Sequence, residues 1–164
     1  MDSKFASASI QHGDFKMKIA IGSDHRGHEQ RKRLTEILNS SGHDPIDCGH
    51  FGTDSADYPD IAVELCRRVV AGEVDRGILV CGTGIGMSIA ANKVDGIRAA
   101  LVCSVDSAQL ASAHNNANVI CLAGNNFDPA FYSDAVNAWL DAEFEGGRHA
   151  RRLDKVAGIS SCDS

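Results

Sequence analysis

The sequence predicts an α/β fold: a single-domain, open, doubly wound (Rossmann-like) three-layer sandwich around a five-stranded parallel sheet. Five short apolar runs alternate with segments of helical periodicity, a pattern typical of parallel strands whose connecting helices cover both faces. One run, 77–81, leads into a glycine-rich loop, 82–86, and then directly into a helix of small residues. In such sheets ligands bind beyond the carboxyl ends of the strands.

The predicted elements follow in order along the chain. Strands are expected over 17–22, 43–48, 77–81, 97–103 and 118–122. Helices are expected over 28–41, from 57, over 87–92, over 106–113, from 128, and again after Gly146 and Gly147. Pro59 and Pro129 suit the first turn of a helix, where a missing N–H costs nothing.

Apolar residues recur on one face of the predicted helices. The first helix is expected to turn Leu34, Ile37 and Leu38 toward the sheet, while Arg31 points outward with the two basic residues after it. The last long helix is expected to bury Phe131, Ala135, Ala138, Trp139 and Ala142.

Length and composition indicate one globular domain over 17–164, with 1–16 as a polar extension outside the fold. The net charge of −6 gives no electrostatic reason to bind nucleic acid or an anionic membrane, and no apolar run has membrane-spanning length. The six cysteines are scattered without a C-x-x-C pair, which favours reduced thiols over disulfides or a zinc site. We therefore expect a cytoplasmic protein.

The glycine loop and Cys81 before it are the first candidate site. Glycines let the backbone approach a ligand, and the N–H groups at a helix start favour anions and developing oxyanions. A dinucleotide fingerprint would need a glycine where Met87 stands, and no Gly-Lys-Ser/Thr phosphate loop is present. The loop could also serve chain geometry alone. Cys81 is either a small core residue or, because a helix N-terminus lowers the pKa of a thiol, an acid–base group.

The remaining candidates are polar residues with ordinary alternatives. His114 could simply end a helix, and His25 beside Asp24 could be a loop pair. Arg148 and Arg152 could lie on a solvated helix face. They are four residues apart, however, so a helix would place both guanidinium groups on one side, where they suit a phosphate dianion.

Six motifs in order give a specific family resemblance. They are Gly22–His25, Asp57–Pro59, Cys81–Lys93, Gly96–Ala99, His114–Asn118 and Glu145–His149, and together they span about 18–156. With these motifs the sequence resembles the ribose-5-phosphate isomerase B family of sugar-phosphate isomerases. The resemblance implies interconversion of an aldose phosphate and its 2-ketose through a cis-enediol, without metal or cofactor. Ribose 5-phosphate and ribulose 5-phosphate, of the pentose phosphate pathway, are the expected pair.

The resemblance also assigns roles to residues. Cys81 resembles the base, since methionine at 87 cannot accept a proton where some members have glutamate. Thr83 and the amides of 82–86, which include Gly82, Gly84, Ile85 and Gly86, resemble the group that holds the enediolate oxygens. His114, assisted by Asp24, resembles the acid that opens the sugar ring. Tyr58 and Asn115 resemble hydroxyl ligands, and His25, Arg148 and Arg152 resemble the phosphate anchor.

Members of the family are homodimers, often paired into tetramers, so the resemblance implies that His114 and Asn115 enter the partner's site. One departure concerns Asn125, where many members carry a phosphate-binding arginine. Allose 6-phosphate, galactose 6-phosphate and tetrose phosphates therefore stay open as substrates. A non-catalytic module that binds a phosphosugar or nucleotide is the alternative from another class, because fold alone does not fix function.

Overall fold

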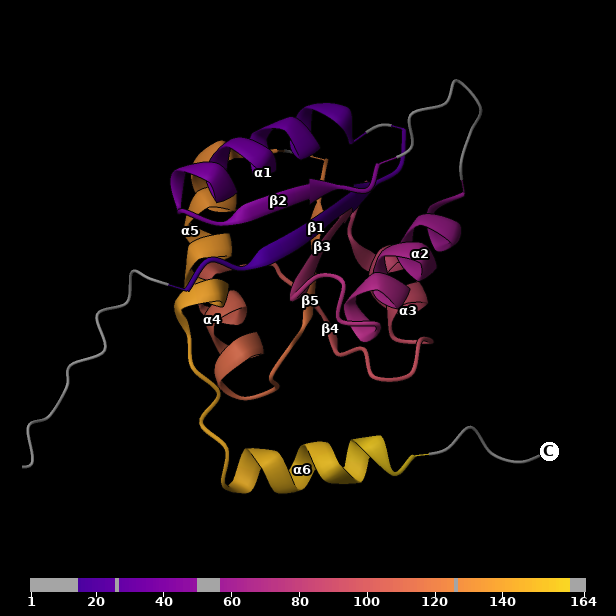
Figure 1. Cartoon of the computed structure of the whole chain (residues 1–164), viewed down its shortest axis with the longest axis vertical. Coiled ribbons are helices and arrows are strands. Elements are labelled where there is room, and N and C mark those ends of the chain that lie inside the picture. Colours follow the sequence, from indigo (N-terminus) through magenta and orange to yellow (C-terminus); the bar gives the residue numbers. More distant parts are fainter. Residues whose placement is uncertain (1–14, 26, 50–56, 126, 160–164) are drawn as a thin grey trace, which may run out of the picture.

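Five parallel strands form one sheet, which confirms the predicted fold class (Figure 1). The computed structural model describes residues 15–25, 27–49, 57–125 and 127–159. The strands are β1 (Lys18–Ser23), β2 (Asp44–Asp47), β3 (Arg76–Cys81), β4 (Ala99–Leu101) and β5 (Val119–Ala123), in the spatial order β2-β1-β3-β5-β4. Most of the predicted extension, 1–14, lies outside the described residues.

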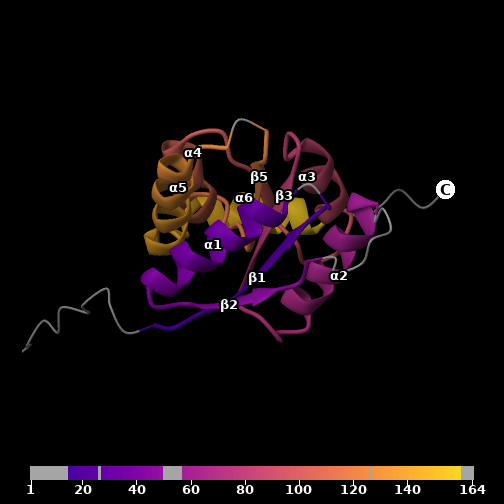
Figure 2. The same cartoon turned by 90° about the horizontal axis from the view of Figure 1, so that it is seen from above.

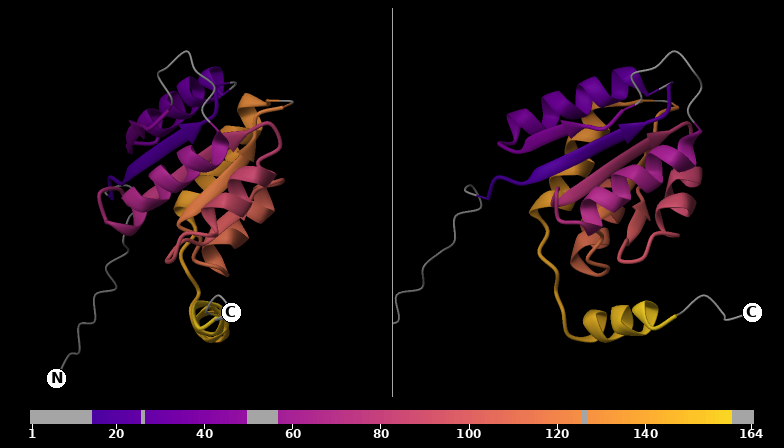
Figure 3. Two further views of the ribbon diagram at one scale, coloured as in Figure 1. Left: turned by 90° about the vertical axis from the view of Figure 1, so that its right-hand side faces the viewer. Right: turned by 45° about the vertical axis from the view of Figure 1, so that its right-hand side comes forward.

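Helices cover both faces of the sheet (Figure 2). On one face lie α1 (His28–Ser40), α4 (Val105–Ala113) and α5 (Pro129–Asp141), and on the other lie α2 (Tyr58–Val70) and α3 (Ile85–Ala91). Successive strand residues point to opposite faces, so Val80 joins the first core and Cys81 the second. A sixth helix, α6 (Arg148–Ala157), stands away from this body at the end of an extended connection (Figure 3).

The packing of α5 corrects part of the prediction. Its buried residues are Tyr132, Ala135, Val136, Trp139 and Leu140, whereas the predicted Phe131, Ala138 and Ala142 are only half-buried. Two side-chain hydrogen bonds fix the rotation of α5 about its own axis. Trp139 Nε1 donates to Ala117 O at 3.0 Å, and the Tyr132 hydroxyl donates to Ala123 O at 2.8 Å. Periodicity alone does not reveal such hydrogen bonds.

Two boundaries also differ from the prediction. The helix expected over 87–92 begins at Ile85, because the positive φ of Gly84 (78°) starts it there. The strand expected over 97–103 is only Ala99–Leu101. The Asn92 side chain donates to Ala99 O and accepts from Ala99 N–H, both at 2.9 Å, and thereby pairs the first residue of β4.

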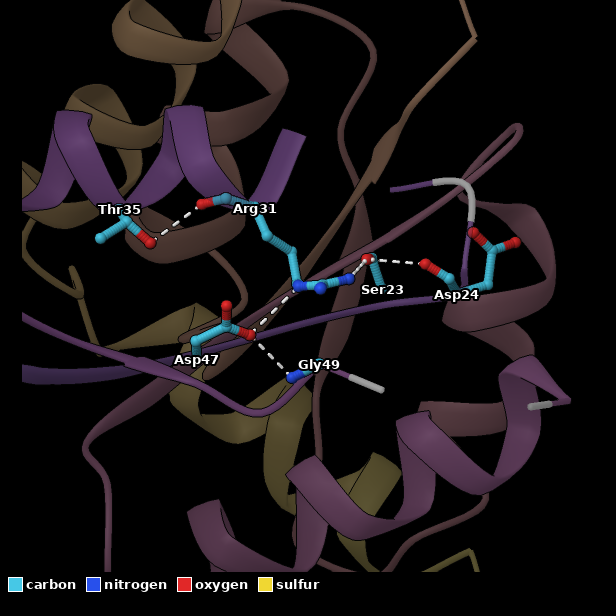
Figure 4. A network of polar contacts seen from close by, with 6 residues as sticks. All are labelled: Ser23, Asp24, Arg31, Thr35, Asp47 and Gly49. Atoms are coloured by element: carbon cyan, nitrogen blue, oxygen red, sulfur yellow. Dashed lines mark hydrogen bonds and ion pairs between the residues drawn. The ribbon is translucent and has the colours of Figure 1, made fainter. Parts of the chain in front are cut away.

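Arg31 is buried, with 3% of its surface exposed, so the prediction that it points outward was wrong (Figure 4). Its Nη1 donates to Ser23 Oγ at 2.6 Å, and its Nε lies 3.1 Å from Asp47 Oδ1. The same carboxylate oxygen accepts from Gly49 N–H at 2.8 Å. One guanidinium group therefore ties the carboxyl ends of β1 and β2 together.

Two further findings concern the whole described chain. All five cysteines in it are free, while Cys162 lies outside it. None of its helices combines the length and apolar character needed to cross a bilayer.

We expect Arg31→Met to lower the free energy of unfolding by about 2 kcal/mol, because it removes a charge-assisted hydrogen bond and leaves Asp47 without its cation. Urea denaturation measures the change. Arg33→Met is the matched control on the same helix: it breaks an exposed pair with Glu36 (side chains 45% and 51% exposed) and should cost less than about 1 kcal/mol. Equal losses would contradict the structural role of Arg31.

Candidate active site

A cavity of about 180 Å³ lies where the carboxyl ends of β1, β3 and β5 meet. Its lining comprises Asp24, Gly27, Gln30, Val80, Cys81, Gly82, Gly124 and Asn125. Asp24 follows β1, Gly82 follows β3, and Gly124 follows β5. The loops after three strands that are distant in sequence therefore form one site. This is the edge of the sheet at which the sequence predicted binding.

Cys81 borders this cavity as the last residue of β3. It is 9% exposed and belongs to the same core as Met87. Because the strand ends at Cys81, the residue also lines the cavity. The other described thiols do not line the cavity. Burial raises the pKa of Cys66 to about 11, and it also raises the pKa of Cys48 and Cys121, which keeps these thiols protonated.

The glycine loop is held by the loop that follows β5. Gly124 N–H donates to Cys81 O at 2.8 Å, and Asn125 N–H donates to Gly82 O at 2.9 Å. Gly84 adopts a φ of 78°, and a Cβ there would lie 2.7 Å from the Leu101 side chain. The backbone next to Cys81 is therefore fixed by hydrogen bonds and close packing before any ligand arrives.

Tyr58 packs against the same loop, and Thr83 is part of it. A Cβ on Gly86 would lie 2.8 Å from the Tyr58 ring, so glycine at 86 lets the ring pack against the backbone. Tyr58 remains 42% exposed, which leaves part of it open to solvent. The Thr83 hydroxyl accepts from Ile85 N–H at 3.3 Å. One amide of the predicted oxyanion group is thus engaged by Thr83 in this structure.

Gln30 is a cavity residue that the sequence reasoning missed. Its Nε2 donates to Gly124 O at 3.2 Å, whereas its buried Oε1 has no hydrogen-bond partner in the described structure. A buried acceptor without a partner is uncommon and suits a hydroxyl donor in the cavity. A polar residue on an amphipathic helix gives no sequence signal for this position.

The sequence profile of the ribose/galactose isomerase family matches residues 19–156. The chain belongs to this family. It is therefore an isomerase, and the alternative of a non-catalytic binding module no longer holds.

Individual relatives cover nearly the whole chain. Ribose-5-phosphate isomerase B of Escherichia coli is 42% identical over 87% of this chain and 95% of its own length. D-erythrulose-4-phosphate isomerase of Pectobacterium atrosepticum is 43% identical over 85% and 93%. The structure of ribose-5-phosphate isomerase B of Clostridium thermocellum superposes with a TM-score of 0.83 at 45% identity, covering 87% of this chain and 97% of that one.

His114 and Asn115, two further predicted site residues, lie at the opposite edge of the sheet. α4 starts after β4 and runs back along the sheet, so His114 at its end lies near the starts of the strands. Arg76, the first residue of β3, donates to Ser112 Oγ at 3.0 Å near that helix end. Cys81 ends the same strand. One chain therefore keeps Cys81 and His114 at opposite edges.

His114 belongs to a cluster with Glu145 and His149. Glu145 Oε2 lies 3.6 Å from His114 Nε2 and 3.4 Å from His149 Nε2, and the two imidazole rings stack at 4.1 Å between centroids and 9° between planes. His149 is buried, while Arg148 Nε donates to its Nε2 at 3.4 Å. Burial lowers the pKa of His149, and the neighbouring His114 and Arg148 lower it further, against the opposite effect of Glu145.

Among the described residues, these three side chains are the group whose nitrogen and oxygen atoms lie close enough together to hold a metal ion, within 4.8 Å of one another. The stacking does not suit that use. An imidazole binds metal along a lone pair in its ring plane, and two nearly parallel planes do not share an ion. The arrangement suits proton sharing better.

The structure thus separates the predicted site residues, and one of them, His25, belongs to neither main group. Asp24, Cys81 and Gly82 line the cavity. Thr83, Gly84, Ile85 and Gly86 continue the chain after Gly82, and Tyr58 lies against Gly86, but these five are not among the lining residues. His114, Asn115, Arg148 and Arg152 lie at the other edge or on α6, with both arginines exposed. His25 is exposed after β1 and does not line the cavity. Glu145 and His149, although part of a recognised motif, received no role from the sequence.

Proposed function

We propose that this isomerase interconverts ribose 5-phosphate and ribulose 5-phosphate through a cis-enediol, with no cofactor. The observation that carries the proposal is that Cys81 borders the cavity beside the glycine loop, while burial keeps three other thiols protonated. The relative from Escherichia coli is named for this activity. The free thiols suit the cytosol, where the pentose phosphate pathway needs such an enzyme.

In the proposed reaction, the Cys81 thiolate removes the proton from C2 of the open-chain aldose. The C2–H electron pair becomes the C1–C2 double bond, and the carbonyl oxygen at C1 accepts the charge and then a proton. Reprotonation at C1 by the same sulfur, with loss of the proton on the C2 hydroxyl, gives the ketose. Amides of the glycine loop and Thr83 stabilise the enediolate, a role that fits their fixed backbone. Met87 is buried and offers no base.

Ring opening and phosphate binding require a second chain in this proposal. His114, with Asp24, opens the sugar ring; Asn115 and Tyr58 bind hydroxyls; His25, Arg148 and Arg152 bind the phosphate. Because His114 and Cys81 lie at opposite edges, we propose a homodimer, which could pair into a tetramer, with each site shared between subunits. The separated α6 supports this arrangement, since it leaves Val156 57% exposed and Ile159 after it 75% exposed.

A tetrose phosphate is the second candidate substrate. Asn125 stands in the cavity lining where many members of the family carry a phosphate-binding arginine, and no arginine or lysine is among the described lining residues. The relative from Pectobacterium atrosepticum is named for a four-carbon ketose phosphate. Other pentose and hexose phosphates, including allose 6-phosphate and galactose 6-phosphate, are compatible with the same chemistry.

We expect Cys81→Ala to bind sugar phosphate but to isomerise it at least about 100-fold more slowly, because general base catalysis is lost. Proton NMR in deuterated water, on a panel of tetrose, pentose and hexose phosphates, measures turnover and exchange at C1 and C2 together. Cys103→Ala, at an exposed thiol away from the cavity, is the control and should retain parental rates. Activity of Cys81→Ala within a few-fold of the parent would remove Cys81 from the base role.

Asn125→Arg should lower KM for ribose 5-phosphate by about one to two decades, because a charge-assisted hydrogen bond contributes about 1.5–3 kcal/mol. Steady-state kinetics on ribose 5-phosphate and a tetrose phosphate measure the change. Asn125→Gln lengthens the side chain without adding charge and should leave KM nearly unchanged. An unaltered KM in the arginine variant would mean that the phosphate lies elsewhere.

Mixing two inactive variants tests whether the site is shared. One chain carries Cys81→Ala and the other carries both Arg148→Ala and Arg152→Ala. Random refolding of equal amounts should recover about a quarter of the parental sites, since half of the dimers are mixed and each has one intact site. If all catalytic groups came from one chain, the mixture would stay as inactive as its components.

A further inference from the structure

The cluster at the end of α4 contains two residues that the proposed reaction does not use. Glu145 places one carboxylate oxygen within ion-pair distance of both imidazoles, 3.6 Å from His114 and 3.4 Å from His149. The connection that carries it is anchored, since Glu145 N–H donates to Ala113 O at 2.9 Å. The carboxylate is therefore held beside the residue that the proposal makes the ring-opening acid.

The two stacked imidazoles differ in their surroundings. His149 has an 8% exposed side chain and receives the Arg148 Nε–H on its Nε2, whereas the His114 side chain is 34% exposed. Charging both rings at 4.1 Å would bring two cations together next to Arg148. Burial and these cations lower the pKa of His149, which favours its neutral form. The Glu145 carboxylate oxygen also lies 3.6 Å from His114 Nε2, so an opposite charge faces that ring.

We propose that Glu145 and His149 are positioning residues for the reaction. Glu145 holds the transferable proton on His114, and neutral His149 stacks under that ring and orients Arg148 for the phosphate. The inference rests on the proposed function, because it assigns His114 and Arg148 the roles given above.

The charged groups around this pair come from three segments. His114 ends α4, Glu145 lies on the connection after α5, and Arg148, His149 and Arg152 belong to the first turns of α6. Both arginines disfavour a second positive charge, and Glu145 is the carboxylate that lies against the imidazoles. Removal of the Glu145 carboxylate should therefore let the cluster lose its proton at a lower pH.

The test compares pH profiles of kcat/KM for two substrates. Ribose 5-phosphate must open a ring, whereas erythrose 4-phosphate has no free hydroxyl placed to close a five-membered ring. An acid is active while protonated, so its activity falls as the pH rises. In Glu145→Gln this alkaline fall should move to lower pH by about one unit for ribose 5-phosphate, as expected for loss of an opposite charge within 4–6 Å. The profile for erythrose 4-phosphate should not move.

Two variants complete the design. Glu143→Gln removes an exposed carboxylate two residues earlier on the same connection and should shift neither profile. His149→Phe keeps a neutral aromatic ring under His114 but removes the acceptor for Arg148. It should raise KM about two- to tenfold for both sugars alike, as loss of one hydrogen bond implies, and leave the alkaline fall where it is.

Each outcome bears on the inference. An unmoved profile in Glu145→Gln, or an equal shift for both sugars, would overturn the role of Glu145. A KM change in His149→Phe for only one sugar, or none, would overturn the role of His149. If the parent protein isomerised neither sugar, the proposed function itself would be wrong and the inference would fall with it. Activity of the parent protein on both sugars distinguishes a failure of the inference from a failure of the proposed function.

Discussion

A parallel sheet places the carboxyl ends of all its strands at one edge, and the helices that return the chain end at the other. That constraint governs this molecule. The exits of β1, β3 and β5 converge on the cavity beside Cys81, while α4 delivers His114 to the far edge. No adjustment of side chains brings these two residues together within one chain. A site that uses both must be assembled from two copies, and each copy then offers a half-site at each edge.

The cavity half is organised mainly by backbone. Hydrogen bonds from 124 and 125 to the carbonyls of 81 and 82 join the exits of β5 and β3, and buried Arg31 joins the exits of β1 and β2. Donors that are fixed before reaction lose little free energy to reorganisation when charge develops on a substrate oxygen. The other half is organised by side chains: the stack of His114 on His149 connects α4 to α6, with the Glu145 carboxylate beside both rings. Rigidity is therefore supplied differently at the two edges.

The sequence was sufficient for what depends on local periodicity and on short motifs. The parallel sheet, the glycine loop at a strand exit and the helix restart after Gly147 were predicted and are present. What failed depends on partners distant in the chain. Arg31 resembled a solvent-facing residue because Asp47, sixteen positions later, reaches it only in the folded sheet. The rotation of α5 is set by acceptors at 117 and 123, and the stacking of His149 on a ring from α4 is likewise non-local.

The charges of the residues that line the cavity indicate which end of a sugar phosphate would enter it. Its described lining contains no arginine or lysine, so none of these residues offers a cation to a phosphate dianion. Two exposed arginines predicted to bind phosphate, Arg148 and Arg152, are on α6, which stands away from the body. On the proposed dimer, the uncharged C1–C2 end of the sugar therefore enters the cavity next to Cys81, and the phosphate stays at the mouth with the arginines of the partner. On that proposed dimer, substrate length would be selected by the distance between the two half-sites, and arginine at 125 in relatives would shift the phosphate toward the cavity.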